Sequence, residues 1–361
     1  MPSEVQNTAQ KFDSISHFLQ TEAFQYRVFE MGRKVFEITN AQFQKIESQQ
    51  ELYPYPFQQK ASLALLFWPD NNENDVVIWF LQFPIDELGY LKQSSRDAFL
   101  IDLLEQAGKN IQAKQAGEVP QDQLAESPFA FKPREDRLAM FHALATVILD
   151  QQPSKHYQYA HDYLLDKSDG GPGFEQWHFL GLQGISDVVA RLNSDNNEAL
   201  LSQAINTLPD TPLHNYAHAL ENIQFGEGLL SALLLRIGQE LQKCPINTGL
   251  VAGLIRAMSS IQPNQKKTDM LVKVLESHLA LEIEVLASIS GRCWNDLKDE
   301  TLLRLFVEKL ALHETMGFNA ILADLIMMPG LREPILDVMR NEQRSAELAK
   351  KFGEFMKTIA S

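Results

Sequence analysis

The pattern of apolar and polar positions divides the chain into two unlike parts. Before residue 116, short apolar runs alternate with turns, which predicts a mixture of helix and strand. The runs at 61–68 and 76–83 are rich in β-branched and aromatic residues, and they flank a stretch dense in turn residues at 69–75. We expect these two runs to form a hairpin. Alternation at 34–38 adds another strand, which predicts an antiparallel sheet of about three strands.

Helices accompany these strands. Apolar positions at near-helical spacing from residue 13 onward predict a first helix that ends at Gly32. A capped start at Ser94, followed by an apolar stripe over 99–104, predicts a second helix that packs on one face of the sheet.

The stretch 117–133 has the composition of a linker and contains Pro120, Pro128 and Pro133. We therefore expect an α+β domain at 1–116, a linker at 117–133 and an all-α domain at 134–361.

The pattern after residue 134 is helical almost throughout, with breakers such as Pro153, Pro209 and Pro263 between segments. Helix starts two apart are separated by roughly 30–40 residues, which is the spacing of helical-hairpin repeats. The tetratricopeptide and ankyrin consensus patterns are both missing. The sequence therefore leaves two architectures open for this domain: a HEAT- or armadillo-like solenoid, or an irregular helical bundle. Helix starts are expected near residues 134, 155, 174, 198, 211, 226, 247, 265, 280, 300, 316 and 331.

The net charge, the cysteine count and the lengths of the apolar runs argue against several classes of protein. The 361 residues carry a formal net charge of −15, which argues against a nucleic-acid partner because phosphate binding needs clustered Lys and Arg. Cys244 and Cys293 are too few for a disulfide framework and suit a reducing compartment. Apolar runs fall short of the ~20 residues that span a bilayer. We expect a soluble cytoplasmic protein that binds no membrane.

Motifs that carry known chemistry are absent from the sequence. It contains no phosphate loop, no Gly-x-Gly-x-x-Gly after a strand, no Gly-x-Ser-x-Gly and no Cys-x-x-Cys. We therefore predict no catalytic residue and no cofactor, and the chain leans away from being an enzyme.

Two histidine motifs keep a metal-dependent hydrolase open as an alternative. His214 and His218 lie one helical turn apart with Glu221 on the same side, a spacing that can hold a divalent metal. His161-Asp162 is a dipeptide that helical phosphohydrolases use to bind metal. Such motifs are common, and ordinary surface or packed helices explain both sets better than a metal site does.

Aromatic residues concentrate in the N-terminal part. Tyr53, Tyr55 and Phe57 form a Tyr-Pro-Tyr-Pro-Phe strip that could dock a protein partner or cover its own sheet as a lid. Trp68 and Trp79, together with Phe80, suggest a second alternative: a small-molecule sensor with a pocket between the domains.

Several segments of the sequence resemble a family of uncharacterised gammaproteobacterial proteins, the domain of unknown function 3549. These segments are FQYRVFEMGRKV at 24–35, YPYP at 53–56, FW at 67–68 and IWFLQFPIDELG at 78–89. The resemblance implies a bacterial cytoplasmic setting and supplies no site residue. We expect a non-catalytic interaction or scaffold protein with a protein partner, since stacked helices offer an extended binding surface.

Overall fold

The computed structural model describes residues 12–71, 75–115, 127–165 and 167–360. The chain forms two compact units. The sheet unit comprises 1–32 and 37–132, and the helical unit comprises 133–361 together with the short segment Arg33–Phe36. Most of the predicted linker lies outside the described residues. Its described end pairs with strand β4, because Gln82 donates its backbone N–H to the carbonyl of Phe129 at 2.8 Å.

A four-stranded antiparallel sheet of order β2-β1-β3-β4 lies near the N-terminus. The predicted hairpin is confirmed as β3 and β4, and it pairs from Lys60 opposite Pro84 to Phe67 opposite Val77. The predicted strand at 34–38 is observed as the shorter β2. The elements of this region are α1 (Ile15–Thr21), β1 (Phe24–Glu30), β2 (Phe36–Ile38), α2 (Asn40–Glu47), β3 (Lys60–Pro69), β4 (Val77–Pro84) and α3 (Gln93–Gln115).

The predicted helix from residue 13 to Gly32 is wrong beyond Thr21. Helix α1 stops there, and Ala23 has a left-handed φ of 57°, a conformation that ends a regular helix. The following residues form β1, in which Tyr26 and Val28 are buried. Their two-residue alternation is a strand signal, and pairing with β3 along the whole of β1 stabilises it.

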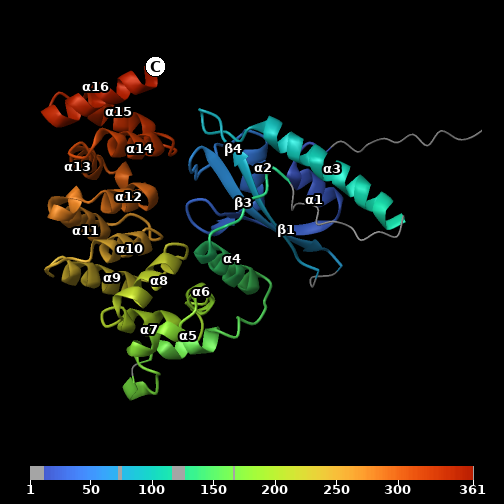
Figure 1. Cartoon of the computed structure of the whole chain (residues 1–361), viewed down its shortest axis with the longest axis horizontal. Helices are drawn as coiled ribbons and strands as arrows, with labels where there is room; N and C mark the ends of the chain where they lie inside the picture. Colours follow the sequence, from blue (N-terminus) through green and yellow to red (C-terminus); the bar gives the residue numbers. More distant parts are fainter. Residues whose placement is uncertain (1–11, 72–74, 116–126, 166, 361) are drawn as a thin grey trace, which may run out of the picture. The chain divides into compact units, whose positions relative to one another are not determined.

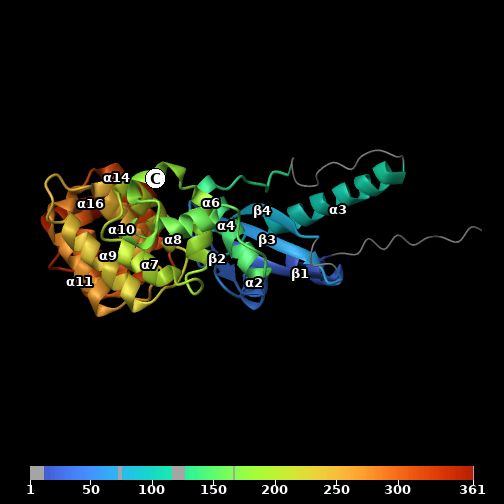
Figure 2. The same ribbon diagram turned by 90° about the horizontal axis from the view of Figure 1, so that it is seen from below.

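The aromatic core of the sheet unit lies between the sheet and helix α3. Trp79 and Phe83 of β4 make edge-to-face contacts with Phe99 of α3, with ring centroids 5.9 and 5.8 Å apart. Such contacts add to the hydrophobic gain of burial. The first part of helix α3 thus packs against β4, as the apolar stripe at 99–104 predicts, and its later turns run outward past the sheet (Figure 2).

The helical unit stacks its helices in two rows (Figure 1). Successive even-numbered helices from α4 to α16 contact one another, and we call them the even row; in the odd row, α7 contacts α9, and α11, α13 and α15 contact in series. The helices are α4 (Glu135–Ile148), α5 (Tyr157–Tyr163), α6 (Leu182–Ala190), α7 (Asn197–Ala204), α8 (Asp210–Leu220), α9 (Glu227–Glu240), α10 (Thr248–Met258), α11 (Gln265–Glu276), α12 (Ile283–Arg292), α13 (Glu300–Leu310), α14 (Thr315–Ile326), α15 (Arg332–Arg340) and α16 (Ala346–Ala360), with short 3₁₀ turns η1 (Lys167–Asp169), η2 (Phe174–Phe179), η3 (His278–Leu281) and η4 (Asp296–Lys298).

Every predicted helix start lies within one turn of an observed α or 3₁₀ start, but the prediction omitted α6 and α16. The glycines around α6 look like helix breakers in the sequence. Gly184 instead allows close packing, since a Cβ there would lie 2.5 Å from the carbonyl oxygen of His156.

No helix in the described ranges combines the length and apolar character needed to cross a lipid bilayer.

Candidate functional site

Three charged side chains at the ends of consecutive even-row helices form the centre of the candidate site. Glu221 caps α8, Arg256 lies in the last turn of α10 and Arg292 ends α12. Arg256 donates from Nε and Nη2 to the two oxygens of Glu221 at 2.8 and 3.0 Å, and Arg292 donates from Nε at 2.9 Å. Three successive even-row helices therefore each contribute one charged side chain from the C-terminal end. We call Glu221, Arg256 and Arg292 the charged ladder.

Positive charge exceeds negative charge around the ladder, because three guanidiniums interact with the single carboxylate of Glu221. Burial opposes ionisation of Glu221, but Arg292, Arg256 and Arg137 lower its pKa to about 2. Burial lowers the pKa of Arg292 to about 10, so this side chain remains charged at neutral pH. Glu221 is only 3% exposed, so the attraction acts with little screening by water.

A cavity of about 250 Å³ lies beside the ladder, among α8, α10 and α12. Small residues of α10 and α12 make room for it: Gly249, Ala252, Gly253 and Ala287. Its polar side chains are His214, His218, Arg256, Glu284, Ser288 and Arg292. A binding pocket is typically this kind of concavity with a few convergent polar groups.

His214 and His218 come together as predicted, with ring centroids 4.2 Å apart. Burial lowers the pKa of His218 to about 4 and also lowers that of His214, with the charge of Arg256 adding to both effects. Both rings are therefore neutral at pH 7. Gly253 accommodates His214, since a Cβ on it would meet Nδ1 of that ring at 2.9 Å.

The predicted metal set does not assemble. Glu221 is held by the two arginines rather than facing the imidazoles. Across the part of the chain that the structure describes, no group of three or more His, Cys, Asp or Glu side chains is placed to hold a metal ion. The geometry therefore gives no support to the metal-dependent hydrolase.

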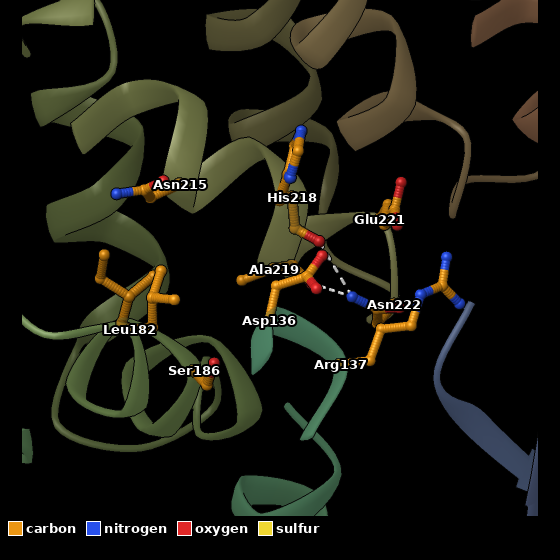
Figure 3. Close-up of a pocket in the computed structure, with 10 residues that line it drawn as sticks. Asp136, Arg137, Leu182, Ser186, Asn215, His218, Ala219, Glu221 and Asn222 are labelled. Atoms are coloured by element: carbon orange, nitrogen blue, oxygen red, sulfur yellow. Dashed lines mark hydrogen bonds between the residues drawn. The ribbon is translucent and has the colours of Figure 1, made fainter. Parts of the chain in front are cut away.

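A second, much smaller cavity of about 30 Å³ lies on the other side of His218, among α4, α6 and α8 (Figure 3). The His218 ring points away from Asp136, and Asn222 donates its side-chain amide to the carbonyls of His218 and Ala219 at 2.9 and 3.0 Å. This space has the size of about one water molecule, so the larger cavity is the better candidate for a ligand.

The segment Arg33–Phe36 lies along the helix ends of the same unit. Asn222 accepts the backbone N–H of Val35 at 2.7 Å, and Arg137 donates to the backbone carbonyl of Arg33 at 2.9 Å. The Lys34 ammonium donates to the carbonyl of Ser259 at 3.0 Å. The helical unit thus binds both backbone polar groups and a side chain of a non-helical segment that bends at Arg33 and Lys34.

The two basic side chains of this segment are also recognised individually. The Arg33 guanidinium pairs with Asp324 of α14 at 2.6 Å. Both cations lie over the ring of Trp294, at 5.5 and 5.3 Å from its centroid, within the range of cation–π attraction. Burial lowers the pKa of Lys34 to about 8.

His161 and Asp162 lie apart from this site, on α5. Nδ1 of His161 is 3.0 Å from the Asp162 carboxylate, and Nε2 is 3.2 Å from the carbonyl of Asp195. Each ring nitrogen therefore lies within hydrogen-bond distance of an acceptor in the chain, and a neutral imidazole donates to one of the two. The pair fastens α5 to the loop before α7.

The aromatic strip divides into a buried and an exposed part. Tyr53 is 1% exposed and its hydroxyl lies 3.3 Å from Glu30, so it presents no surface to a partner. Tyr55 is half-buried, and burial raises its pKa. Phe57 is 40% exposed and keeps a surface for docking.

The aromatics proposed for a sensor pocket belong to the sheet. Trp68 and Trp79 are buried on β3 and β4, and Phe80 contacts Phe131 with centroids 6.2 Å apart.

The sequence prediction missed Arg256 and Arg292 and assigned Glu221 a different role. A signal exists: the two arginines are 35 and 71 positions after Glu221, the period of one and two repeats. All three residues lie at the C-terminal end of a helix with many buried apolar positions, where a charged residue is costly to bury without a partner.

The comparisons with known proteins give one result. No curated protein and no solved structure matches the chain. Residues 10–356 match a family described as protein of unknown function (DUF3549). This match spans almost the whole sequence, and the chain therefore belongs to the DUF3549 family.

Proposed function

We propose that the chain is a non-catalytic interaction scaffold whose helical unit binds extended protein segments. The observation that carries the proposal is the seating of Arg33–Phe36 along the even row. Backbone groups of Val35 and Arg33 are bound by side chains of Asn222 and Arg137. Contacts with a backbone do not depend on sequence, so the same helix ends suit other extended segments.

The two-row stacking supports the same function. Each helical hairpin buries its apolar face against its neighbours, and repeats of this kind expose long continuous surfaces. We assign the unit to the HEAT- or armadillo-like solenoids on this basis. Two free cysteines, one exposed and one buried, agree with a reducing cytoplasmic location.

The test is affinity purification of the tagged full-length chain from its source cells with a matched pair of variants. Leu182 on α6 of the even row is 38% exposed, and Leu235 on α9 of the odd row is 55% exposed. Each is replaced by Arg, which both exposed positions tolerate. The proposal predicts a stoichiometric protein partner that is lost from Leu182→Arg and kept by Leu235→Arg. A partner that both variants retain, or no partner at all, contradicts it.

A further inference from the structure

The cavity among α8, α10 and α12 holds polar groups that the protein itself does not use. Within the described residues, Nη1 of Arg256, Nη2 of Arg292 and the ring nitrogens of His214 and His218 have no hydrogen-bond partner. All four side chains line the same space. None of these nitrogens is fully buried, and the Arg256 and Arg292 side chains are 18% and 12% exposed. A molecule that enters the cavity can therefore replace water at several converging hydrogen-bonding groups.

The charged side chains around the cavity indicate which charged groups a bound molecule carries. At the end of the cavity where Arg256 and Arg292 lie, Glu221 neutralises one of the two guanidiniums. Asp136 attracts Arg256 electrostatically, and Arg137 attracts Glu221 in the same way. Lys34 also acts on Glu221 and Arg292, and the sum over these six side chains is two excess positive charges, so this end attracts an anion. The two imidazoles are neutral, and the Glu284 carboxylate on the same cavity repels a second negative charge, so a carboxylate suits the lining better than a phosphate dianion.

The opposite end has the opposite charge. Glu284 lies in the first turn of α12 and lines the cavity. It acts electrostatically on both His214 and Arg256. Glu284 and Arg292 are eight positions apart on one helix, which corresponds to roughly 12 Å along its axis. The side chains of both residues line the same cavity, so a ligand held at both ends carries a cation as well as a carboxylate.

We propose that this cavity binds a small zwitterion, a free amino acid or a short peptide, with its carboxylate at Arg256 and Arg292 and its ammonium at Glu284. His214 and His218 contribute neutral hydrogen-bonding nitrogens along the wall. This site is independent of the scaffold function, because it rests on the cavity and not on the seating of Arg33–Phe36.

Calorimetric titration of the full chain tests the site. The probes are the twenty L-amino acids and a mixed tripeptide library with free carboxyl ends, each beside its carboxamide form, and inorganic phosphate. A charge-assisted contact predicts that the carboxamide binds roughly tenfold to a hundredfold more weakly. Glu284→Gln weakens binding roughly twofold to fivefold, because that carboxylate is exposed.

A plug variant and its matched control locate the binding. Gly249 is the second residue of α10, and a Cβ there meets no atom closer than 3.8 Å. The atoms nearest to it are Oδ1 of Asn247 and Oε1 of Glu284, so the side chain of Gly249→Leu extends into the cavity at the Glu284 end. Gly228 is the second residue of α9, and its Cβ position is open. We expect Gly249→Leu to abolish binding and Gly228→Leu to leave it unchanged.

The outcomes separate the possible ligands. Tighter binding of a single amino acid than of any tripeptide identifies a free amino acid as the ligand, and the reverse identifies a peptide end. Absence of binding by every probe, phosphate binding above all others, equal binding of the carboxamides, or binding that survives Gly249→Leu overturns the proposal. None of these results changes the partner test with Leu182 and Leu235, so the two proposals can fail separately.

Discussion

Removing the Glu221 carboxylate tests the charged ladder most sharply. Glu221→Gln keeps the shape of the side chain but leaves Arg256 and Arg292 without their common anion. The folded pKa of Glu221 is about 2, against an ordinary value of 4.5. At 1.36 kcal/mol per unit, this difference corresponds to about 3 kcal/mol of stability at pH 7. Breaking a buried ion pair costs a similar amount, about 3–5 kcal/mol.

The pH dependence has a definite sign. Because the pKa is lower in the folded chain, the stabilisation is complete above pH 4.5 and is lost as the pH falls toward 2. Glutamine does not titrate at this position. The stability difference between the natural chain and Glu221→Gln should therefore narrow by about 1.4 kcal/mol between pH 7 and pH 3.5.

Urea denaturation followed by far-ultraviolet circular dichroism measures both quantities. Glu284→Gln is the control, since an exposed carboxylate beside the same cavity should change stability by less than about 1 kcal/mol. Adding Arg292→Gln to Glu221→Gln should cost less than the sum of the single changes, because it removes an uncompensated cation. A stability loss below about 1 kcal/mol for Glu221→Gln would refute the reasoning. A stability difference from the natural chain that stays constant between pH 7 and pH 3.5 would refute it as well.

Three further predictions concern single positions. Gly238→Ala should raise the free energy of unfolding by up to about 1 kcal/mol in urea titration, since a Cβ at this position in the last turn of α9 meets no atom within 4 Å; a loss of stability would contradict this. A thiol reagent should modify only the exposed Cys244 in the native chain, and should modify Cys293 only after unfolding, because burial raises the pKa of Cys293 to about 12. If both cysteines react rapidly in the native chain, the prediction is wrong. Tyr53→Ala should destabilise the chain by about 3 kcal/mol or more and Phe57→Ala by far less, since only Tyr53 is buried; equal melting temperatures would disprove this assignment.

The sequence predicted the helical unit well because its signals are local. Breakers such as Pro209 and Pro263 precede α8 and α11, and apolar positions repeat at helical spacing between them. The α+β class followed from the contrast between this region and the hairpin of β3 and β4. Strand β1 was missed because apolar residues four positions apart, such as Phe24 and Val28, fit helical spacing as well as alternation, and only pairing with β3 decides between them.

The candidate site was less accessible because it is assembled from residues far apart in the chain. The proximity of His214 and His218 follows from one helix, and it was predicted. The partners of Glu221 are 35 and 71 positions away, and only the stacking of α8, α10 and α12 brings them together. The burial of Tyr53 likewise depends on Glu30 of β1, a strand that the sequence did not predict.

The most direct test of the scaffold function is site-specific photocrosslinking in the source cells. A photoreactive phenylalanine replaces Leu182 on the even row in one strain and Leu235 on the odd row in another. The proposed function predicts one defined protein adduct from position 182 and none from position 235. Irradiation that yields no adduct at 182, or the same adducts at both positions, contradicts binding of a partner along the even row.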